Sequence, residues 1–285
     1  MKIVIGVDWS EQAFAAVREV FALYAPHEVV LVHGVDLGIF RHPVVAQAAN
    51  LQGYEEFRRA MQDAGRQLME RTSALVPSDT PSVRKIYDFA RPAAFLLDTA
   101  QKVNPDLIAV GARGRGPVSE LLLGSVSHRI LMHSTCPTLI VKGEARPPKR
   151  VLVAVEGTED AQRIRTWLIN HPFRTPIELV VTTVIEQPRL TDPASILVFE
   201  SWAKSASQYA EDLVKTTAAA LANHQYTVTT QILNGDPASM IAAQGEAFDL
   251  LVVGSHGRTG ADRFLLGSVS HSITHRSIRP VLVVR

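Results

Sequence analysis

Short apolar runs alternate with longer amphipathic stretches along the first half of the chain. Residues 2–7 (KIVIGV) form a short, continuous run rich in Val and Ile, which is typical of a buried parallel strand. Apolar side chains at helical spacing follow Ser10, a suitable N-cap, and predict a helix over residues 11–24. Further strands are expected at residues 29–35, 83–87, 106–110 and 138–141, with helices at 52–75 and 92–102 and a third after residue 124.

The same order of elements returns in the second half. Strands are expected at residues 150–155, 177–185, 227–233, 249–253 and 281–284. Thr158 is expected to cap one helix, Pro237 to start another, and residues 195–222 to be largely helical. Strands that alternate with helices imply right-handed βαβ crossovers and a parallel sheet. The sequence therefore predicts the α/β class, with two tandem Rossmann-like, doubly wound domains. We expect them at residues 1–143 and 150–285, joined by a short proline-rich linker at 144–149.

A glycine pattern occurs once in each half. Gly111, Gly114, Gly124 and Ser125 follow the rule G-x2-G-x9-G-S, and all four recur 143 residues later as Gly254, Gly257, Gly267 and Ser268. The residues 122–128 (LLGSVSH) recur without change at 265–271. Self-similarity at one fixed offset indicates a duplicated unit, here of domain size.

The pattern has a physical use at the end of a strand. Gly111 lacks a Cβ, so we expect a ligand to approach its backbone, and Gly114 allows a positive φ in a tight loop. Gly124 and Ser125 start a helix, whose free N–H groups and dipole suit an anion. Arg113 and Arg115, with His256 and Arg258 in the second copy, add positive charge. The sequence therefore predicts a polyphosphate site, with ordinary loop glycines as the alternative. Neither a Walker P-loop nor a G-x-G-x-x-G motif after the first strand is present.

These glycines, with Val7-Asp8-Trp9-Ser10 near the start, resemble the universal stress protein family, two such domains in one chain. In nucleotide-binding members the glycine pattern holds the phosphates of ATP, whereas other members lack it. The resemblance implies strand order 3-2-1-4-5 in each domain. It also implies a cytoplasmic protein that forms dimers and acts as a nucleotide-dependent regulator or sensor in stress survival.

The same resemblance assigns roles to two further residues. With that strand order, Asp8 and Gly111 face one crevice, where Asp8 contacts the nucleoside or Mg²⁺ bound with ATP, and Val35 offers its backbone to adenine. The alternatives are a helix-capping Asp8 and a core Val35. The expected site residues are Asp8, Val35, Gly111, Arg113, Gly114, Gly124, Ser125 and Val126 in the first domain. In the second they are Gly254, His256, Gly257, Gly267, Ser268 and Val269.

Two positions depart from the family pattern V-D-G-S. Trp9 replaces its glycine, and we expect the ring to stack over the ligand or to narrow the pocket mouth. Glu156 stands where the second domain should have Asp, and the extra methylene moves the carboxylate about one bond length outward. We therefore expect the first domain to bind nucleotide better than the second.

Composition restricts the remaining classes of function. The net charge of +1 provides no bulk electrostatic attraction to nucleic acid or to a membrane surface. Cys136 is the single cysteine, so no intrachain disulfide can form. The chain starts directly with a strand, without a signal peptide, and no apolar run approaches the roughly 18 residues of a membrane helix. We expect a cytoplasmic protein.

No catalytic set is recognisable. The Ser/His/Asp, HExxH and CxxC patterns are absent, so neither catalytic residues nor metal ligands are assigned. His128 and His271 recur at matching positions and are interpreted as a duplicated, partly solvated helix face. His256 and Arg258 leave slow ATP hydrolysis open. Another alternative is an apolar or lipid-like ligand in the second domain, near Phe199, Trp202 and Tyr209.

The fifth strand of each domain is apolar and lies at the expected sheet edge. Exposed edges favour strand pairing. We predict that the two fifth strands pair antiparallel, so that one chain imitates a family dimer. A homodimer and protein partners stay open.

Overall fold

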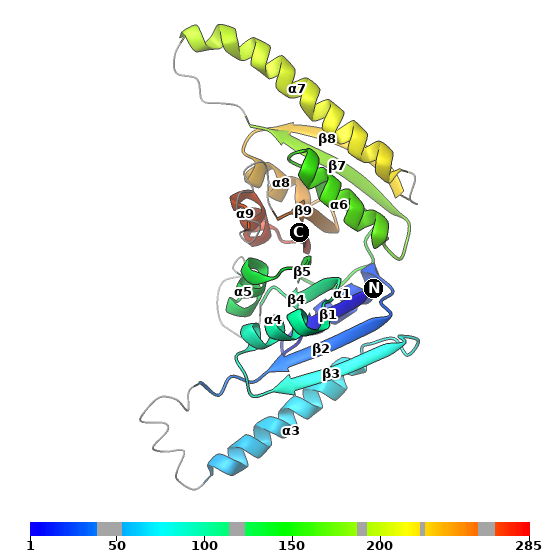
Figure 1. The fold of residues 1–285 in the computed structure, drawn as a ribbon, viewed down its shortest axis with the longest axis vertical. Coiled ribbons are helices and arrows are strands. Elements are labelled where there is room, and N and C mark those ends of the chain that lie inside the picture. Colours follow the sequence, from blue (N-terminus) through cyan, green and yellow to red (C-terminus); the bar gives the residue numbers. More distant parts are fainter. Residues whose placement is uncertain (39–52, 114–122, 187–192, 223–225, 256–265) are drawn as a thin grey trace. The chain divides into compact units, whose positions relative to one another are not determined.

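The computed structural model describes residues 1–285 except 39–52, 114–122, 187–192, 223–225 and 256–265, and for 193–201 it describes the backbone alone. The chain forms two compact units, Met1–Ala145 and Arg146–Arg285. Figure 1 shows the elements of each unit in sequence colours. Each unit carries one copy of the glycine pattern.

The first unit is a five-stranded parallel sheet with helices packed on it (Figure 1). Its strands are β1 (Lys2–Gly6), β2 (Glu28–Gly34), β3 (Ser82–Asp88), β4 (Leu107–Gly111) and β5 (Thr138–Val141). Its helices are α1 (Glu11–Leu23), α3 (Tyr54–Ser73), α4 (Pro92–Val103) and α5 (Ser125–His133). The strands pair in the order β3-β2-β1-β4-β5, which confirms the expected order.

The second unit repeats this arrangement. Its strands are β6 (Arg150–Ala154), β7 (Ile177–Ile185), β8 (Tyr226–Asn234), β9 (Leu250–Gly254) and β10 (Val281–Val284). Its helices are α6 (Thr158–Asn170), α7 (Pro193–Leu221), α8 (Pro237–Gly245) and α9 (Ser268–Arg276). The order β8-β7-β6-β9-β10 is again parallel throughout. The α/β class with two doubly wound units is therefore confirmed.

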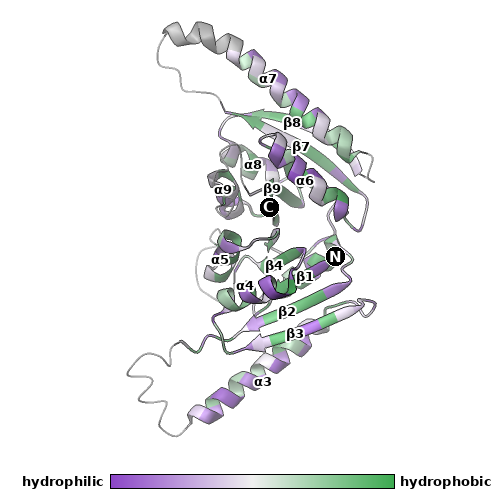
Figure 2. Cartoon of the chain, in the orientation of Figure 1, coloured by the Kyte–Doolittle hydropathy of each residue, from purple (hydrophilic) through white to green (hydrophobic). Residues whose placement is uncertain are grey.

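The apolar runs become the centre of each sheet because both faces are covered. Every residue of β4 and of β9 is buried, and Figure 2 shows these central strands as hydrophobic while α3 alternates between polar and apolar positions. That alternation places Leu68 and Met69 of α3 in the core, where they are almost fully buried. The arrangement leaves the carboxyl ends of the strands as the place where a ligand can enter.

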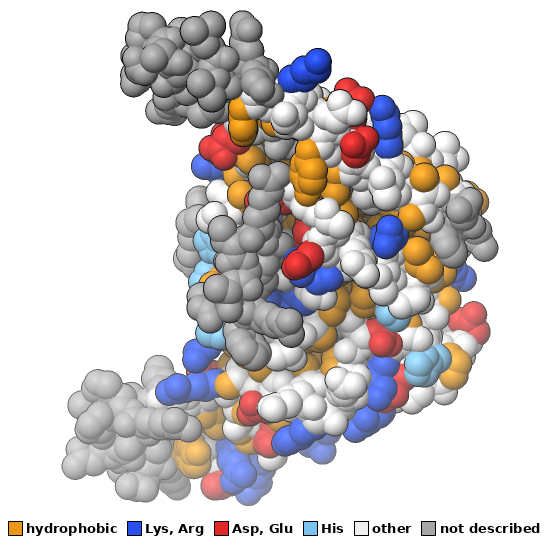
Figure 3. Space-filling view, turned by 45° about the horizontal axis from the view of Figure 1, so that its top comes forward, with side chains coloured by type: hydrophobic (Ala, Val, Ile, Leu, Met, Phe, Trp, Pro, Cys, Tyr) orange, Lys and Arg blue, Asp and Glu red, His pale blue; other side chains and the backbone are white. Residues whose placement is uncertain are grey.

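Charged side chains of both signs are interleaved on the face shown in Figure 3. Ion pairs connect β3 to its neighbours: Lys85 with Glu70 of α3 at 2.7 Å, and Arg84 with Glu28 of β2 at 3.4 Å. These pairs are partly exposed, so each contributes on the order of 1 kcal/mol or less to stability.

Two element boundaries bear on the site. Helix α1 begins as expected, because the Ser10 hydroxyl accepts a hydrogen bond from the Ala13 amide at 3.1 Å. The expected cap of α6 is wrong: Thr158 is its first helical residue, and the N-cap is Gly157, which has no side chain to donate or accept. Strand β2 ends at Gly34, so Val35 lies just beyond it.

Candidate functional site

A cavity of about 550 Å³ lies at the carboxyl ends of β1, β2 and β4 in the first unit. The strand ends contribute Gly6, Val7, Asp8, Val32, His33, Gly34, Val110, Gly111 and Arg113. The helices contribute Ala13, Pro92 and Leu96, together with Leu123 to Ser127 at the start of α5. The volume suits a small-molecule site, and the position is where the strand order reverses.

Six of the residues expected from the sequence therefore line one cavity: Asp8, Gly111, Arg113, Gly124, Ser125 and Val126. Gly114 lies outside the described residues. Val35 is not among the lining residues, and its amide donates to the carbonyl of Asp88 at 2.9 Å, which extends the pairing of β2 with β3. The backbone of β2 reaches the cavity at Gly34 instead, one residue earlier than expected.

Asp8 is held at the end of β1 by the residue that caps α1. Its Oδ1 accepts a hydrogen bond from the Ser10 amide at 2.9 Å and another from the Ser10 hydroxyl. Ser10 is the helix cap, so the alternative role of Asp8 as the cap does not apply. Since none of the described residues donates a hydrogen bond to Oδ2 of Asp8, that oxygen is suited to a hydroxyl group or a cation of a ligand.

Gly111 is required for a reason that differs from the expected one. A Cβ at this position would lie 2.7 Å from the carbonyl carbon and oxygen of Gln12 and 2.9 Å from the amide of Ala13. The missing side chain therefore lets α1 pack closely against β4, whereas the sequence suggested room for a ligand. Gly111 still lines the cavity, and its carbonyl accepts a hydrogen bond from the Ser127 hydroxyl at 2.6 Å.

The start of α5 presents amide groups to the cavity. Gly124 is the N-cap in an extended conformation. Its amide donates a hydrogen bond to the carbonyl oxygen of Ala112 at 2.7 Å, which connects the helix start to the end of β4. Gly124 itself has no side chain that could cap the helix. The first-turn amides of Ser125 and Val126, at the positive end of the helix dipole, are therefore suited to an anion.

Two cationic residues follow the ends of β4 and β5. Arg113 lines the cavity, and its backbone amide donates to Oε1 of Gln12 at 2.9 Å. Lys142 follows β5, whose last residue pairs with Gly111. Burial, and then the charge of Arg113, lower the pKa of Lys142 to about 8. Arg113 therefore brings positive charge to the cavity, whereas Lys142 is not among the residues that line it.

His33 is a cavity residue that sequence reasoning missed. Its Nδ1 lies 2.8 Å from the Val7 carbonyl oxygen, which can only accept, so Nδ1 carries the proton. Burial lowers the pKa of His33, although the Val7 contact and the Asp8 charge act in the opposite direction. The imidazole is therefore neutral at pH 7, and its Nε2 is a hydrogen-bond acceptor. The sequence did contain a signal for this residue, because a histidine near the end of an apolar strand is unusual enough to suggest a functional role.

The matching cavity of the second unit has only about 50 Å³. It is lined by Ala154, Val155, Glu156, Asp160, Thr183, Val184, Pro237, Ile241, Val253, Gly254, Val269, Ser270 and Ile273. Gly254 and Val269 are thus present as expected, whereas Gly267 and Ser268 do not line it and His256 and Gly257 lie outside the described residues. The expected residues are therefore only partly brought together here.

Asp160 explains the small volume. A Cβ on Gly254 would lie 1.6 Å from Oδ1 of Asp160, so the carboxylate occupies the space beside the glycine. Oδ2 accepts from the Glu156 amide at 3.3 Å, and Arg163 Nη2 lies 3.6 Å from Oδ1. Asp160 is 5 % exposed. Burial, with a smaller contribution from the charge of Glu156, raises its pKa to about 6 against the opposing effects of the Glu156 amide and Arg163.

A family model described as "Universal stress protein family" matches residues 1–142 and again residues 147–285. The chain belongs to the universal stress protein family. A curated universal stress protein of Mycobacterium tuberculosis is 28% identical over 297 residues, covering 99% of this chain and 96% of the relative.

A solved universal stress protein has the same fold. The crystal structure of one from Archaeoglobus fulgidus matches with a TM-score of 0.66 at 20% identity, covering 100% of this chain and 98% of that one. A universal stress protein family protein from Arabidopsis thaliana, solved with AMP bound, covers 48% of this chain and 91% of its own, at 20% identity and a TM-score of 0.37.

Other expectations for these universal stress protein domains concern aromatic side chains. Trp9 is not among the cavity residues, and Arg71 lies over its ring at 5.9 Å. Trp202 and Tyr209, expected near an apolar pocket, are 44% and 41% exposed and do not line the second cavity. The side chain of Phe199 lies outside the described residues.

In the part of the chain that the structure describes, every helix is too short or too polar to span a bilayer.

Proposed function

We propose that the first domain binds ATP and that the chain acts in the cytoplasm as a nucleotide-dependent regulator or sensor in a stress response. One observation carries the proposal. A cavity of about 550 Å³ combines the uncapped start of α5, Arg113 and the carboxylate of Asp8 at the point where the strand order reverses. That combination offers donors for a phosphate chain at one end and acceptors for a nucleoside at the other.

The amides of Ser125 and Val126 and the charge of Arg113 would hold the phosphates, because charge-assisted hydrogen bonds to backbone amides are strong. Asp8 would accept from a ribose hydroxyl or hold Mg²⁺, which prefers oxygen ligands. The neutral His33 would accept from a hydroxyl or an amino group of the nucleoside. Each of these residues has a binding role, so binding rather than turnover is proposed.

The second domain would not bind nucleotide at neutral pH. Its cavity of about 50 Å³ lies far below the several hundred Å³ of small-molecule sites, which also argues against a lipid-like ligand there. Glu156 and Asp160 would also place two carboxylates where a triphosphate needs positive charge. The predicted antiparallel pairing of the two fifth strands concerns the placement of the two units and stays a prediction.

A substitution at the first residue of α5 tests the phosphate site. Ser125→Pro removes one amide N–H and the hydroxyl at a position where proline is tolerated, because the first helical amides have no intrahelical partner. Ser125→Ala, which loses the hydroxyl alone, is the reference for the effect of the amide. Gly124 already has the extended backbone, φ −66 and ψ 159, that the residue before a proline prefers. Loss of one hydrogen bond to a charged group should weaken ATP·Mg²⁺ binding roughly tenfold to a hundredfold in calorimetry.

The matched control is Ser268→Pro at the start of α9. Its N-cap Gly267 has the same extended backbone, φ −60 and ψ 148, so the backbone change is equivalent. We expect one bound ATP per chain and an unchanged affinity in this variant. If Ser125→Pro bound ATP as tightly as the unmodified chain, the amides of α5 would not hold the phosphates and the proposal would fail.

A further inference from the structure

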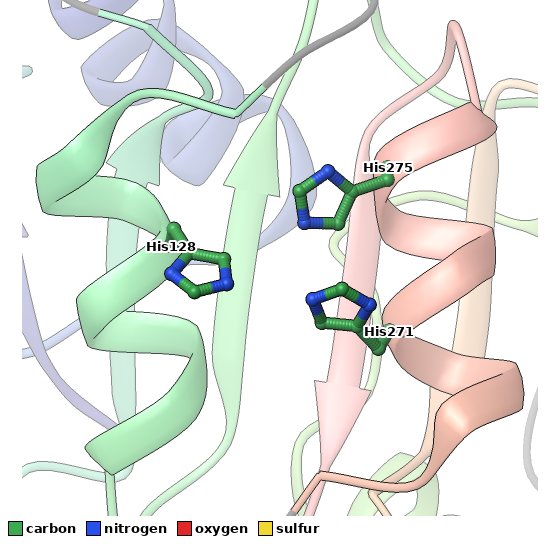
Figure 4. Close-up of side chains that lie close together, drawn as sticks. All are labelled: His128, His271 and His275. Carbon is green, nitrogen blue, oxygen red and sulfur yellow. The ribbon is translucent and has the colours of Figure 1, made fainter.

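Two histidines lie one helical turn apart on α9. His271 and His275 are spaced i, i+4, which places them on the same face of the helix. Their ring centroids are 4.4 Å apart with an interplanar angle of 39°. Figure 4 shows both rings projecting from the same side of α9. Both side chains are partly exposed, although the Nε2 atom of His275 is buried.

The spacing suits a chelate. One ring nitrogen of His271 lies within 4.8 Å of a ring nitrogen of His275. Imidazole nitrogens bind Zn²⁺ at about 2.0–2.1 Å, so two of them on one tetrahedral ion are about 3.3 Å apart. A small side-chain rotation closes that difference, while the rigid helix backbone keeps the two rings together. Neither ring lines the second cavity, so the pair is separate from the candidate nucleotide site.

Domain duplication accounts for only one of the two histidines. His271 has a counterpart in His128 of α5, inside the segment that recurs without change. At the position that matches His275, the first domain has Met132. The second histidine therefore distinguishes α9 from α5 and turns a single imidazole into a pair with ligand spacing.

We propose that His271 and His275 bind a divalent transition-metal ion of the Zn²⁺ and Cu²⁺ class. Neutral imidazole is a preferred ligand for these ions, whereas Mg²⁺ and Ca²⁺ prefer oxygen. Water completes the coordination shell of an ion held by two side chains on the protein surface. The site does not depend on nucleotide binding by the first domain.

The test is calorimetric titration of the full-length chain, without an affinity tag, with ZnCl₂ in the absence of nucleotide. We expect one ion per chain, and at least a tenfold loss of affinity in His271→Ala and in His275→Met, because each leaves a single imidazole. The second variant introduces the residue that the first domain has at this position. Circular dichroism of both variants should match the unmodified chain, since both positions are partly exposed.

The control variant is His27→Ala in the first unit. The His27 Nδ1 lies 2.6 Å from the N-terminal amine, which makes it another nitrogen pair that a metal ion could use. We expect unchanged Zn²⁺ binding in this variant. Loss of binding in His27→Ala with full binding in both α9 variants would overturn the proposal, as would undiminished binding in all three.

Electron paramagnetic resonance of the Cu²⁺-loaded chain gives a second readout. Two coordinated imidazoles should produce hyperfine coupling to two nitrogens, and His275→Met should reduce the coupling to one. A merely structural role of His275 would leave this signature unchanged, and an unchanged two-nitrogen signal in the variant would contradict the assignment.

Discussion

The two cavities occupy the same place in two copies of one fold, yet one has about 550 Å³ and the other about 50 Å³. The difference does not come from the glycine pattern, which both copies keep in full. It comes from the first helix of each domain, where Gln12 in one copy corresponds to Asp160 in the other. The same glycine spacing therefore does not ensure the same cavity, because a buried side chain opposite the glycines can fill it.

Gln12 and Asp160 use the same place differently. Gln12 accepts a hydrogen bond from the Arg113 amide at 2.9 Å and thereby holds the strand end that carries a cation. Asp160 instead turns its carboxylate against Gly254 and toward the Glu156 amide. One side chain supports a positively charged site, and the other places a negative charge in the cavity.

The largest expected effect follows from exchanging these residues. Gln12→Asp should weaken ATP binding at pH 7.5 by at least about a thousandfold, because a carboxylate next to the phosphates costs several kcal/mol and the bond to the Arg113 amide is lost. Calorimetry on the full chain measures the affinity. Gln12→Asn, which adds no charge, is the control and should lose much less. Equal losses in the two variants would show that charge is not what separates the cavities.

Asp160 should also make the stability of the second unit depend on pH. Its folded pKa of about 6 lies above the ordinary value of 3.8, so the folded state holds the proton more tightly than the unfolded state. The free energy of unfolding therefore falls as pH rises from about 4 to about 6 and stays lower above that range. The shift corresponds to roughly 3 kcal/mol.

Asp160→Asn removes this charge and keeps an oxygen that can accept from the Glu156 amide. We expect the variant to be more stable than the unmodified chain at pH 7.5, by up to roughly 3 kcal/mol, and equally stable near pH 4. Urea unfolding followed by circular dichroism at both pH values measures this. Asp63→Asn, at an exposed position, is the control. A variant no more stable at pH 7.5 than the unmodified chain would show that the buried charge of Asp160 does not destabilise the folded state.

A smaller effect is expected from adding a Cβ to the glycine that ends the fourth strand of each domain. Gly111→Ala should lower the free energy of unfolding by roughly 1–3 kcal/mol, because its Cβ would meet the backbone of Gln12, which cannot move alone. Gly254→Ala meets the side chain of Asp160 instead. In the background of Asp160→Ala, Gly254→Ala should therefore cost little, whereas no side-chain truncation at position 12 should rescue Gly111→Ala. Urea unfolding of each glycine variant, with and without truncation of the opposing side chain, shows whether the added Cβ meets backbone or side-chain atoms.

Much of this architecture could be predicted from the sequence. Each of the ten strands in the described residues was predicted from the sequence. Most are apolar runs because a buried parallel strand needs both faces apolar, whereas β3 and β8 are more polar and more exposed. Ser10 marked the start of α1. The fixed offset of the glycine pattern predicted the duplication. The cavity of the first domain could be anticipated because the strand order brings Asp8 to the residues that follow β4.

The difference between the cavities could not be predicted in the same way. Glu156 was noticed because it interrupts a motif, whereas Asp160 lies in an ordinary helical stretch. Its effect depends on the direction of its carboxylate, which lies against Gly254, a residue far away in the sequence. His33 was missed for the same reason, since its role follows from the contact with Val7 on the neighbouring strand. Side-chain direction between distant segments has no signature in local periodicity.

The smallest expected effect concerns the caps of the first helices, which also differ between the domains. Ser10 caps α1 with its hydroxyl, whereas Gly157 caps α6 without a side chain. Ser10→Ala should therefore cost about 1 kcal/mol of unfolding free energy, while Gly157→Ser should gain only a few tenths, because glycine is already a tolerated N-cap.

Ser10→Ala should in addition weaken ATP binding, since the Ser10 hydroxyl and amide both hold Asp8 in place. Ser10→Thr, which keeps the hydroxyl, should restore both stability and affinity. If Ser10→Ala lost stability but bound ATP normally, the position of Asp8 would not depend on the cap, and the capped helix start would be a feature of the fold alone.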